Sequence, residues 1–184
     1  MGIEPVWRYL PGGVCAYGDR ARPVTVPALY WSTTPVTRAQ LGKAGDGDVP
    51  VTGLDHDEAR EAAASLGGRL PRSVEWEWMA AGGERRRFPW GDADWTPAKA
   101  NLRPSGRRGP TPVCTHPEGV TPDGLLDVAG NVWEWTASPS LGGGAIIRGG
   151  SYHSLPLYAT CRFLNAAPRE LRSPGIGFRV VREP

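Results

Sequence analysis

The oxygen-bearing side chains that could hold a hard cation are concentrated in one stretch, Gly124–Thr136, which reads GLLDVAGNVWEWT. Asn131 and Glu134 supply side-chain oxygens there, and the Gly-Asn turn adds backbone carbonyls close to them. Calcium prefers a ligand set of this kind. The same two side chains would serve equally well as partners for backbone groups in a buried strand, because Asn is a common turn residue. The residues alone therefore leave a calcium site and a structural corner as alternatives.

Nitrogen and sulfur donors lie further along the chain, where His153 and Cys161 could together bind a metal. A lone His and a lone Cys more often have no such role. The other cysteines, Cys15 and Cys114, bring the total to an odd number and add no C-x-x-C spacing. We expect free thiols and residence in the cytoplasm, because the sequence shows no signal-peptide pattern and no apolar run of about 18 residues.

The strand that carries Glu134 must position these groups. Trp133 and Trp135 flank it at period 2, which predicts that both indoles lie on one face and the carboxylate on the other. A chain of 184 residues with eight tryptophans can build one core, so we expect a single domain over residues 1–184. Its 25 glycines and 19 prolines favour turns and short strands over long helices.

Local signals place the other elements. Apolar runs bounded by Gly and Pro predict strands over residues 6–10, 14–17 and 24–31, and the run over residues 146–151 predicts a strand that leads into a Gly-Gly turn. Capping boxes at Thr37–Gln40 and Asp55–Glu58 predict the starts of two helices, and a third is expected over residues 73–81. His56 falls in the first turn of the second helix, where we expect it to be solvated. Residues 90–124 form a long loop, which is either functional or held by something external such as an ion.

Six sequence blocks in register resemble the formylglycine-generating (sulfatase-modifying) enzyme superfamily. They are Leu70–Trp78 (LPRSVEWEW), Phe88–Asp92 (FPWGD), Ala100–Asn101, Gly130–Trp135 (GNVWEW), Arg148–Tyr152 (RGGSY) and Gly177–Val181 (GFRVV). The blocks cover most of the chain from about residue 35. The resemblance implies an α+β domain with a variant C-type-lectin-like fold, rich in irregular structure.

The resemblance also implies calcium. In the family a first calcium lies beside the Ala-Asn pair, and a second lies around the residues that match Asn131, Val132 and Glu134 here. Asn101 keeps the first pattern, but the arginine-rich stretch of residues 103–109 follows where carboxylates are wanted. Arginines repel a dication, so we expect the first site to be lost or altered. The second site keeps its pattern, and structural calcium is expected there.

The family enzymes use two cysteines, a few residues apart after the R-G-G-S block, to bind copper(I) and activate oxygen. Soft thiolates suit that ion. Here Ser154 stands where the first cysteine is expected, and Cys161 reaches the second position only with a small shift. We therefore expect a member without the two-cysteine copper site, which does not convert sulfatase cysteines. Copper or iron bound in another way remains open.

Two classes of function follow from this resemblance. One is a metal- and oxygen-dependent oxidoreductase or maturation enzyme that acts on a small molecule or a peptide. The other is a non-catalytic binding module, like the variable proteins of this fold, that presents residues 152–158 to a ligand or protein. An accessory subunit that lends this face to a partner enzyme is a third possibility. The net charge of +2 gives no reason to expect nucleic acid or membrane as a partner.

The candidate residues for an enzyme lie mostly in the segment after the R-G-G-S block. The predicted catalytic residues are Ser151, Tyr152, His153, Ser154, Cys161 and Arg162, and the predicted substrate-binding residues are Trp135, Arg148, Tyr158 and Arg169. Arg162, Arg169 and Arg172 could clamp a carboxylate bidentately. Alternatively they pair with acids of the chain, and for Arg162 we favour such a structural pair, with Glu134 among the candidates.

Overall fold

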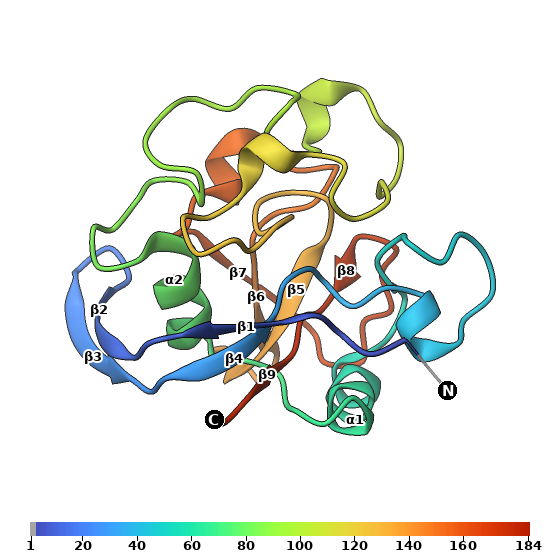
Figure 1. The fold of residues 1–184 in the computed structure, drawn as a ribbon, viewed down its shortest axis with the longest axis horizontal. Helices are drawn as coiled ribbons and strands as arrows, with labels where there is room; N and C mark the ends of the chain where they lie inside the picture. Colours follow the sequence, from blue (N-terminus) through green and yellow to red (C-terminus); the bar gives the residue numbers. More distant parts are fainter. Residues whose placement is uncertain (1–2) are drawn as a thin grey trace.

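The computed structural model describes residues 3–184, which form short strands joined by long connections (Figure 1). The first part of the chain contains β1 (Trp7–Leu10), β2 (Gly13–Tyr17), β3 (Arg22–Val26), β4 (Leu29–Ser32), the 3₁₀ helix η1 (Ala39–Leu41), α1 (His56–Ser65) and α2 (Ser73–Ala81). The second part contains η2 (Arg103–Ser105), η3 (Pro117–Gly119), β5 (Trp133–Pro139), β6 (Ala145–Arg148), η4 (Pro156–Ala159), β7 (Leu164–Ala167), β8 (Ile176–Gly177) and β9 (Val181–Arg182). The predicted α+β class is confirmed.

The strands form three small sheets, with the orders β1-β4-β9, β2-β3 and β7-β6-β5-β8. All pairings are antiparallel except that of β5 with β8, which is parallel and places Glu134 opposite Gly177. This pairing brings the C-terminal G-F-R block beside the tryptophan-flanked strand. Two of the six sequence blocks, far apart in the chain, thus meet at the centre of the fold.

Most elements lie where the local signals predict them. The Asp55–Glu58 capping box forms with both of its hydrogen bonds and starts α1, and α2 covers the predicted residues 73–81. The predicted strand over 24–31 is instead two strands, since Pro27 has no N–H to donate and the chain breaks there. The prediction that His56 is solvated is wrong, because its side chain packs edge-on against Trp135 and is only 3% exposed.

The tryptophan pattern on β5 has the predicted effect. Trp133 and Trp135 pack into one apolar cluster together with residues of α1, with Ile176 of β8 and with Phe178 and Val180. Glu134 points to the other side, toward Trp76 of α2, which belongs to a second apolar cluster. The carboxylate therefore lies between the two clusters, where it has no contact with solvent.

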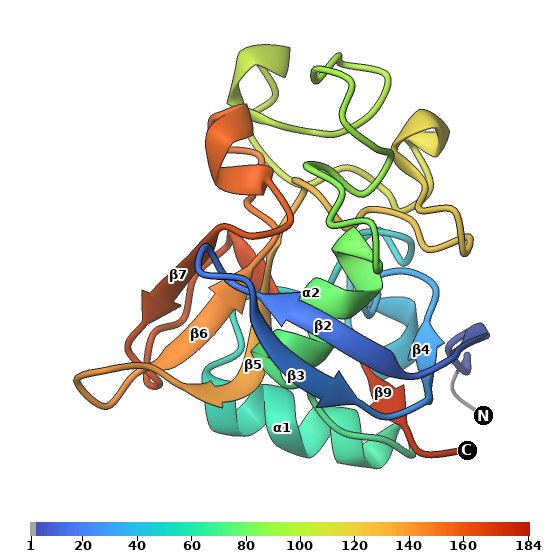
Figure 2. The ribbon, with the colours of Figure 1, turned by 90° about the vertical axis from the view of Figure 1, so that its left-hand side faces the viewer.

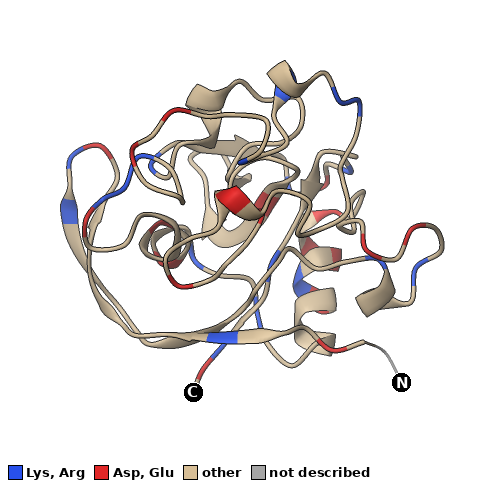
Figure 3. Ribbon diagram, turned by 45° about the horizontal axis from the view of Figure 1, so that its top comes forward, with Lys and Arg blue, Asp and Glu red and all other residues tan. Residues whose placement is uncertain are grey.

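The long connections gather at one end of the molecule and α1 lies at the other (Figures 1 and 2). Hydrogen bonds from within the described chain hold the loop over residues 90–124, for example from Trp95 Nε1 to the Ala100 carbonyl and between His116 Nδ1 and the Pro97 carbonyl. Figure 3 shows basic and acidic residues interspersed along the ribbon. Neither α-helix of the described chain has the length and apolar character needed to span a bilayer.

Candidate functional site

Glu134 forms a fully buried ion pair with Arg179 of the G-F-R block. Arg179 donates from Nε and Nη2 to the carboxylate at 2.9–3.0 Å, and Trp76 Nε1 donates to it at 2.7 Å. Both charged side chains are 0% exposed. Arg179 also donates to the carbonyls of Leu126, Ser32 and Thr33. Every oxygen of the carboxylate thus accepts from the protein itself, as a buried charge requires.

Asn131 is equally occupied. Its Oδ1 accepts from the Thr111 N–H at 2.8 Å and from Asn101 Nδ2 at 3.1 Å, and its Nδ2 donates to the Thr111 carbonyl. The residue adopts a left-handed backbone with φ of +64°, which Asn tolerates better than most residues. The amide therefore ties the loop at 101–111 to the start of β5, which is the structural alternative that the sequence left open.

These residues do not fit the calcium site predicted at Asn131, Val132 and Glu134. Calcium needs free oxygen ligands, whereas both side chains already accept hydrogen bonds and a guanidinium lies against the carboxylate. Within residues 3–184, no three His, Cys, Asp or Glu side chains are grouped as metal ligands. The cation beside Glu134 is Arg179. The sequence reading instead favoured Arg162, which is exposed and pairs with no acid in the described chain.

Arg148 was predicted to bind substrate, but it lies in the interior. It is 0% exposed and donates from Nη2 to Glu77 at 2.8 Å and to the carbonyl of Cys161 at 2.6 Å, and its guanidinium lies 5.1 Å from the centre of the Trp76 ring. Nη1 reaches the Ser73 hydroxyl. This arginine cannot meet a ligand from solvent. Its role is to fix the backbone after η4.

Cys161 does not form a metal pair with His153. The thiol is 0% exposed within the apolar cluster of Trp31 and Trp76, and burial raises its pKa to about 12, so it stays protonated at neutral pH. His153 is exposed on the surface. Cysteine binds copper(I) as the thiolate, and one buried thiol that stays protonated does not provide the site. The sequence predicts no two-cysteine site in this segment, and in the structure Cys161, the cysteine that the segment does contain, is buried.

Ser151 and Ser154 close a tight turn after the Gly149–Gly150 pair. Ser154 Oγ accepts from the Ser151 N–H at 2.9 Å, and the Ser154 N–H donates to the Ser151 carbonyl at 2.8 Å. Gly150 has φ of +76°, and a Cβ there would lie 3.2 Å from that of Ala159. The hydroxyl at the position where the family has a cysteine therefore stabilises the turn. Both serines are buried, and within residues 3–184 neither hydroxyl is hydrogen-bonded to a basic side chain that would make it a nucleophile.

The exposed part of the predicted segment forms a surface that we call the η4 face, consisting of His153, Leu155, Leu157, Tyr158, Arg162 and Leu164. Leu157 is 64% exposed, unusual for a leucine, while Tyr158 packs edge-on against Phe163. Tyr152 is buried beneath His153, with ring centres 4.4 Å apart. A groove of about 630 Å³ opens between this face, the β2–β3 turn at Gly18–Asp19 and Arg87.

Two predicted substrate-binding residues lie away from this face. Trp135 is 0% exposed and donates from Nε1 to the Leu54 carbonyl, so it is core rather than a pocket wall. Arg169 follows β7 at the opposite end of the sheet, since Ala167 pairs with Ala145 whereas Leu164 pairs with Arg148. Arg172 is bound to Asp55 and Glu58. The three arginines thus form no common clamp.

Residues 26–184 match the family model described as the sulfatase-modifying factor enzyme 1-like domain. The chain belongs to this family. It is 39% identical over 142 residues to the hercynine oxygenase of Mycolicibacterium smegmatis, covering 74% of this chain and 32% of that protein. It is 28% identical over 197 residues to the formylglycine-generating enzyme of Streptomyces coelicolor, covering 87% of this chain and 60% of that protein. The chain thus spans about a third of the length of the first relative.

Solved structures of the family fold agree with the architecture. PvdO from Pseudomonas aeruginosa superimposes with a TM-score of 0.82 at 21% identity, covering 98% of this chain and 95% of that one. Treponema denticola variable protein 1 gives 0.78 at 19% identity, with coverage of 97% and 95%. The predicted superfamily and its variant C-type-lectin-like fold are confirmed, and at these identities the likeness concerns the fold alone.

Proposed function

We propose that this domain forms the substrate-binding part of an oxidoreductase of the formylglycine-generating superfamily that acts on a small molecule or a peptide. The η4 face carries the proposal, because the fold presents exposed aromatic, apolar and cationic side chains there beside a groove of about 630 Å³. Its similarity to hercynine oxygenases, which are named for oxidation of a small molecule, supports the class. The buried Cys161 thiol and the serine at position 154 argue against the oxidation of sulfatase cysteines.

The face is suited to recognise an acid with an apolar body. Arg162 lines the groove and makes no ion pair within residues 3–184, so it supplies positive charge for a carboxylate, whereas Arg87 is already paired with Asp94. Leu157 and Phe163 supply apolar wall. Arg148 holds the Cys161 carbonyl from below, which keeps the segment in one conformation before ligand arrives. A surface that is fixed in advance loses less conformational entropy on binding.

The donors of this chain do not fit copper or iron, so the proposal assigns the redox centre to another domain or to a partner chain. Such a metal would activate oxygen, and this chain would hold the substrate. Leu155, Leu157 and Tyr158 are exposed within one short segment of this face, and apolar side chains gathered in this way suit a contact with that second component.

Binding is the first test. Hercynine and a short cysteine-containing peptide are titrated by calorimetry into the wild-type chain, the Arg162→Gln variant and Arg107→Gln, which changes an exposed arginine outside the groove. We expect saturable binding of one probe, weakened about tenfold in Arg162→Gln only, as the loss of a charge-assisted hydrogen bond implies. Binding of neither probe, or equal loss in both variants, contradicts the proposal.

Activity is tested in an assembled protein. The chain replaces the matching segment of the Mycolicibacterium smegmatis hercynine oxygenase, and oxygen uptake with hercynine is recorded for the wild-type fusion and for fusions with Arg162→Gln and Cys161→Ser. We expect uptake that falls in the Arg162 variant and persists in the Cys161 variant. Uptake that requires Cys161 would show that this thiol holds the metal and would overturn the proposal.

A second candidate is a non-catalytic binding module. It is favoured by the lack of any three-residue metal-ligand group in residues 3–184 together with the apolar exposure of the η4 face. A folded fusion that binds hercynine or peptide but consumes no oxygen supports this candidate over the first.

A further inference from the structure

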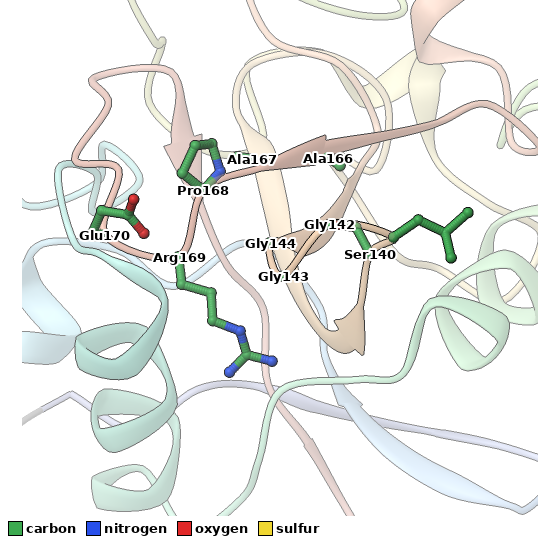
Figure 4. A pocket seen from close by; sticks show the side chains of 10 residues that line it. Ser140, Gly142, Gly143, Gly144, Ala166, Ala167, Pro168, Arg169 and Glu170 are labelled. Carbon is green, nitrogen blue, oxygen red and sulfur yellow. The ribbon is translucent and has the colours of Figure 1, made fainter.

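A second cleft lies at the end of the molecule opposite the η4 face. It has a volume of about 300 Å³ and lies between the start of α1 and the end of β5, with Leu70 and Ala137 among its lining residues. Arg169 also lines a neighbouring hollow, which Figure 4 shows. In that view the Arg169 side chain lies on the same side of the hollow as Glu170, with the Gly142–Gly144 turn across from it. The cleft is thus separated from the η4 face by the length of β7.

Arginines surround this cleft in excess over acids. Arg169 is exposed and makes no ion pair within residues 3–184, and Arg60 has only a 3.5 Å contact with the exposed Asp57. Arg69 also lines the cleft, but its guanidinium is occupied by Glu75 and Glu183. Two guanidinium groups therefore remain available above an apolar floor, and such groups bind carboxylates in a forked geometry.

His56 supplies a second, independent sign of a ligand. It lines the cleft and is 3% exposed, and its Nε2 lies 2.8 Å from the carbonyl of Thr136. A carbonyl can only accept, so Nε2 carries a proton, and in the neutral imidazole Nδ1 then presents a lone pair. That Nδ1 is buried and has no partner in the described chain. Buried polar atoms normally have partners, so an unpaired acceptor in a cleft wall calls for a donor.

One backbone contact links these two features. The His56 N–H donates to the Arg169 carbonyl at 2.9 Å, which fixes the start of α1 against the segment after β7. The histidine and the unpaired arginine are therefore held at one rigid place. Arg172 binds Asp55 and Glu58 at the same helix start and offsets one of their two negative charges. Asp57, which also lines the cleft, lies 3.5 Å from Arg60.

We propose that this cleft binds a small organic acid that carries an apolar body and a hydroxyl or amino donor next to its carboxylate. The carboxylate meets Arg169 and Arg60, the donor meets His56 Nδ1, and the apolar body lies on Leu70 and Ala137. A volume of about 300 Å³ is at the lower end for small-molecule sites, so the ligand is a 2-hydroxy or 2-amino acid rather than a peptide. This site is independent of the function proposed for the η4 face.

The test uses 3-phenyllactate as probe, with 3-phenylpropionate to remove the hydroxyl and 3-phenyllactamide to remove the charge. Affinities are measured by calorimetry on the full chain, and the imidazole of His56 is followed by nitrogen-detected NMR. We expect phenyllactate to bind more tightly than either analogue and to shift the Nδ1 resonance of His56. The affinity should fall about tenfold or more in Arg169→Gln.

The matched control is Arg107→Gln, an exposed arginine that lines neither this cleft nor the groove of the η4 face, which should leave phenyllactate binding unchanged. Both variants are surface changes that should fold, which thermal melting checks. Equal weakening in both variants, equal affinity of the three probes, or no binding at millimolar concentrations overturns the proposal. A His56 signal that does not respond to saturating phenyllactate assigns the binding to another place and also overturns it.

Discussion

Replacement of Arg179 by Met tests whether the protein itself supplies the cation at the centre of the fold. The substitution keeps much of the side-chain volume but leaves the Glu134 carboxylate, which is 0% exposed, with Trp76 as its one remaining side-chain donor within residues 3–184. Removing one partner of a buried ion pair costs about 3–5 kcal/mol, because the other charge stays buried without compensation. Three carbonyls also lose the hydrogen bond that Arg179 donates to them.

The assay is urea unfolding followed by tryptophan fluorescence, since Trp76 reports directly on the carboxylate. With a slope of about 2–3 kcal/mol/M, the expected loss moves the midpoint down by about 1–2.5 M. Arg162→Met is the matched control, as an exposed arginine whose loss should change stability by no more than about 0.5 kcal/mol. Wild-type curves should coincide in calcium and in chelator. An unchanged midpoint in Arg179→Met, or a wild-type curve that rises with calcium, would refute the reasoning.

Three further predictions address the interior. Cys114 is exposed and should react with a thiol reagent in the native protein. Cys15 and Cys161 should react only on unfolding, because burial raises the pKa values of their thiols to about 11 and about 12 and keeps them protonated. Labelling of the native protein that persists in Cys114→Ser would contradict this. Burial raises the pKa of Asp127 above its ordinary 3.8, so the folded state binds a proton more tightly than the unfolded state and this group's contribution to stability is lost as the pH rises through the folded pKa. Asp127→Asn should therefore melt higher than wild type at pH 7 and equally at pH 3, and a lower melting temperature at pH 7 would count against the assignment. Arg148→Met should lower the free energy of unfolding by about 3–5 kcal/mol, measured by urea unfolding, since it leaves Glu77 buried and unpaired; a loss below about 1 kcal/mol would show that the pair does not hold this part of the fold.

The sequence by itself determined the family, the fold and the helices. The six blocks name a fold because each is a local pattern that can be read without knowing what it touches. The capping box at Asp55–Glu58 works for the same reason, as its two hydrogen bonds join residues three positions apart. The spacing of the two tryptophans on β5 likewise predicts which side of the strand each indole lies on. Pro27 indicates the break between β3 and β4, which the predicted strand over residues 24–31 did not include.

Only the tertiary structure decided the partners of the charged groups. Glu134 is bound to Arg179, 45 residues away, because parallel pairing of β5 with β8 brings the G-F-R block alongside. No periodicity distinguishes Arg179 from Arg148 or Arg162, and yet the first two are buried and the third is exposed. Which arginine is buried depends on where the strand pairing places a carboxylate in the interior, because a buried charge is stable only when it is paired. Glu134, which the sequence predicts as a calcium ligand, is therefore paired with an arginine of the same chain.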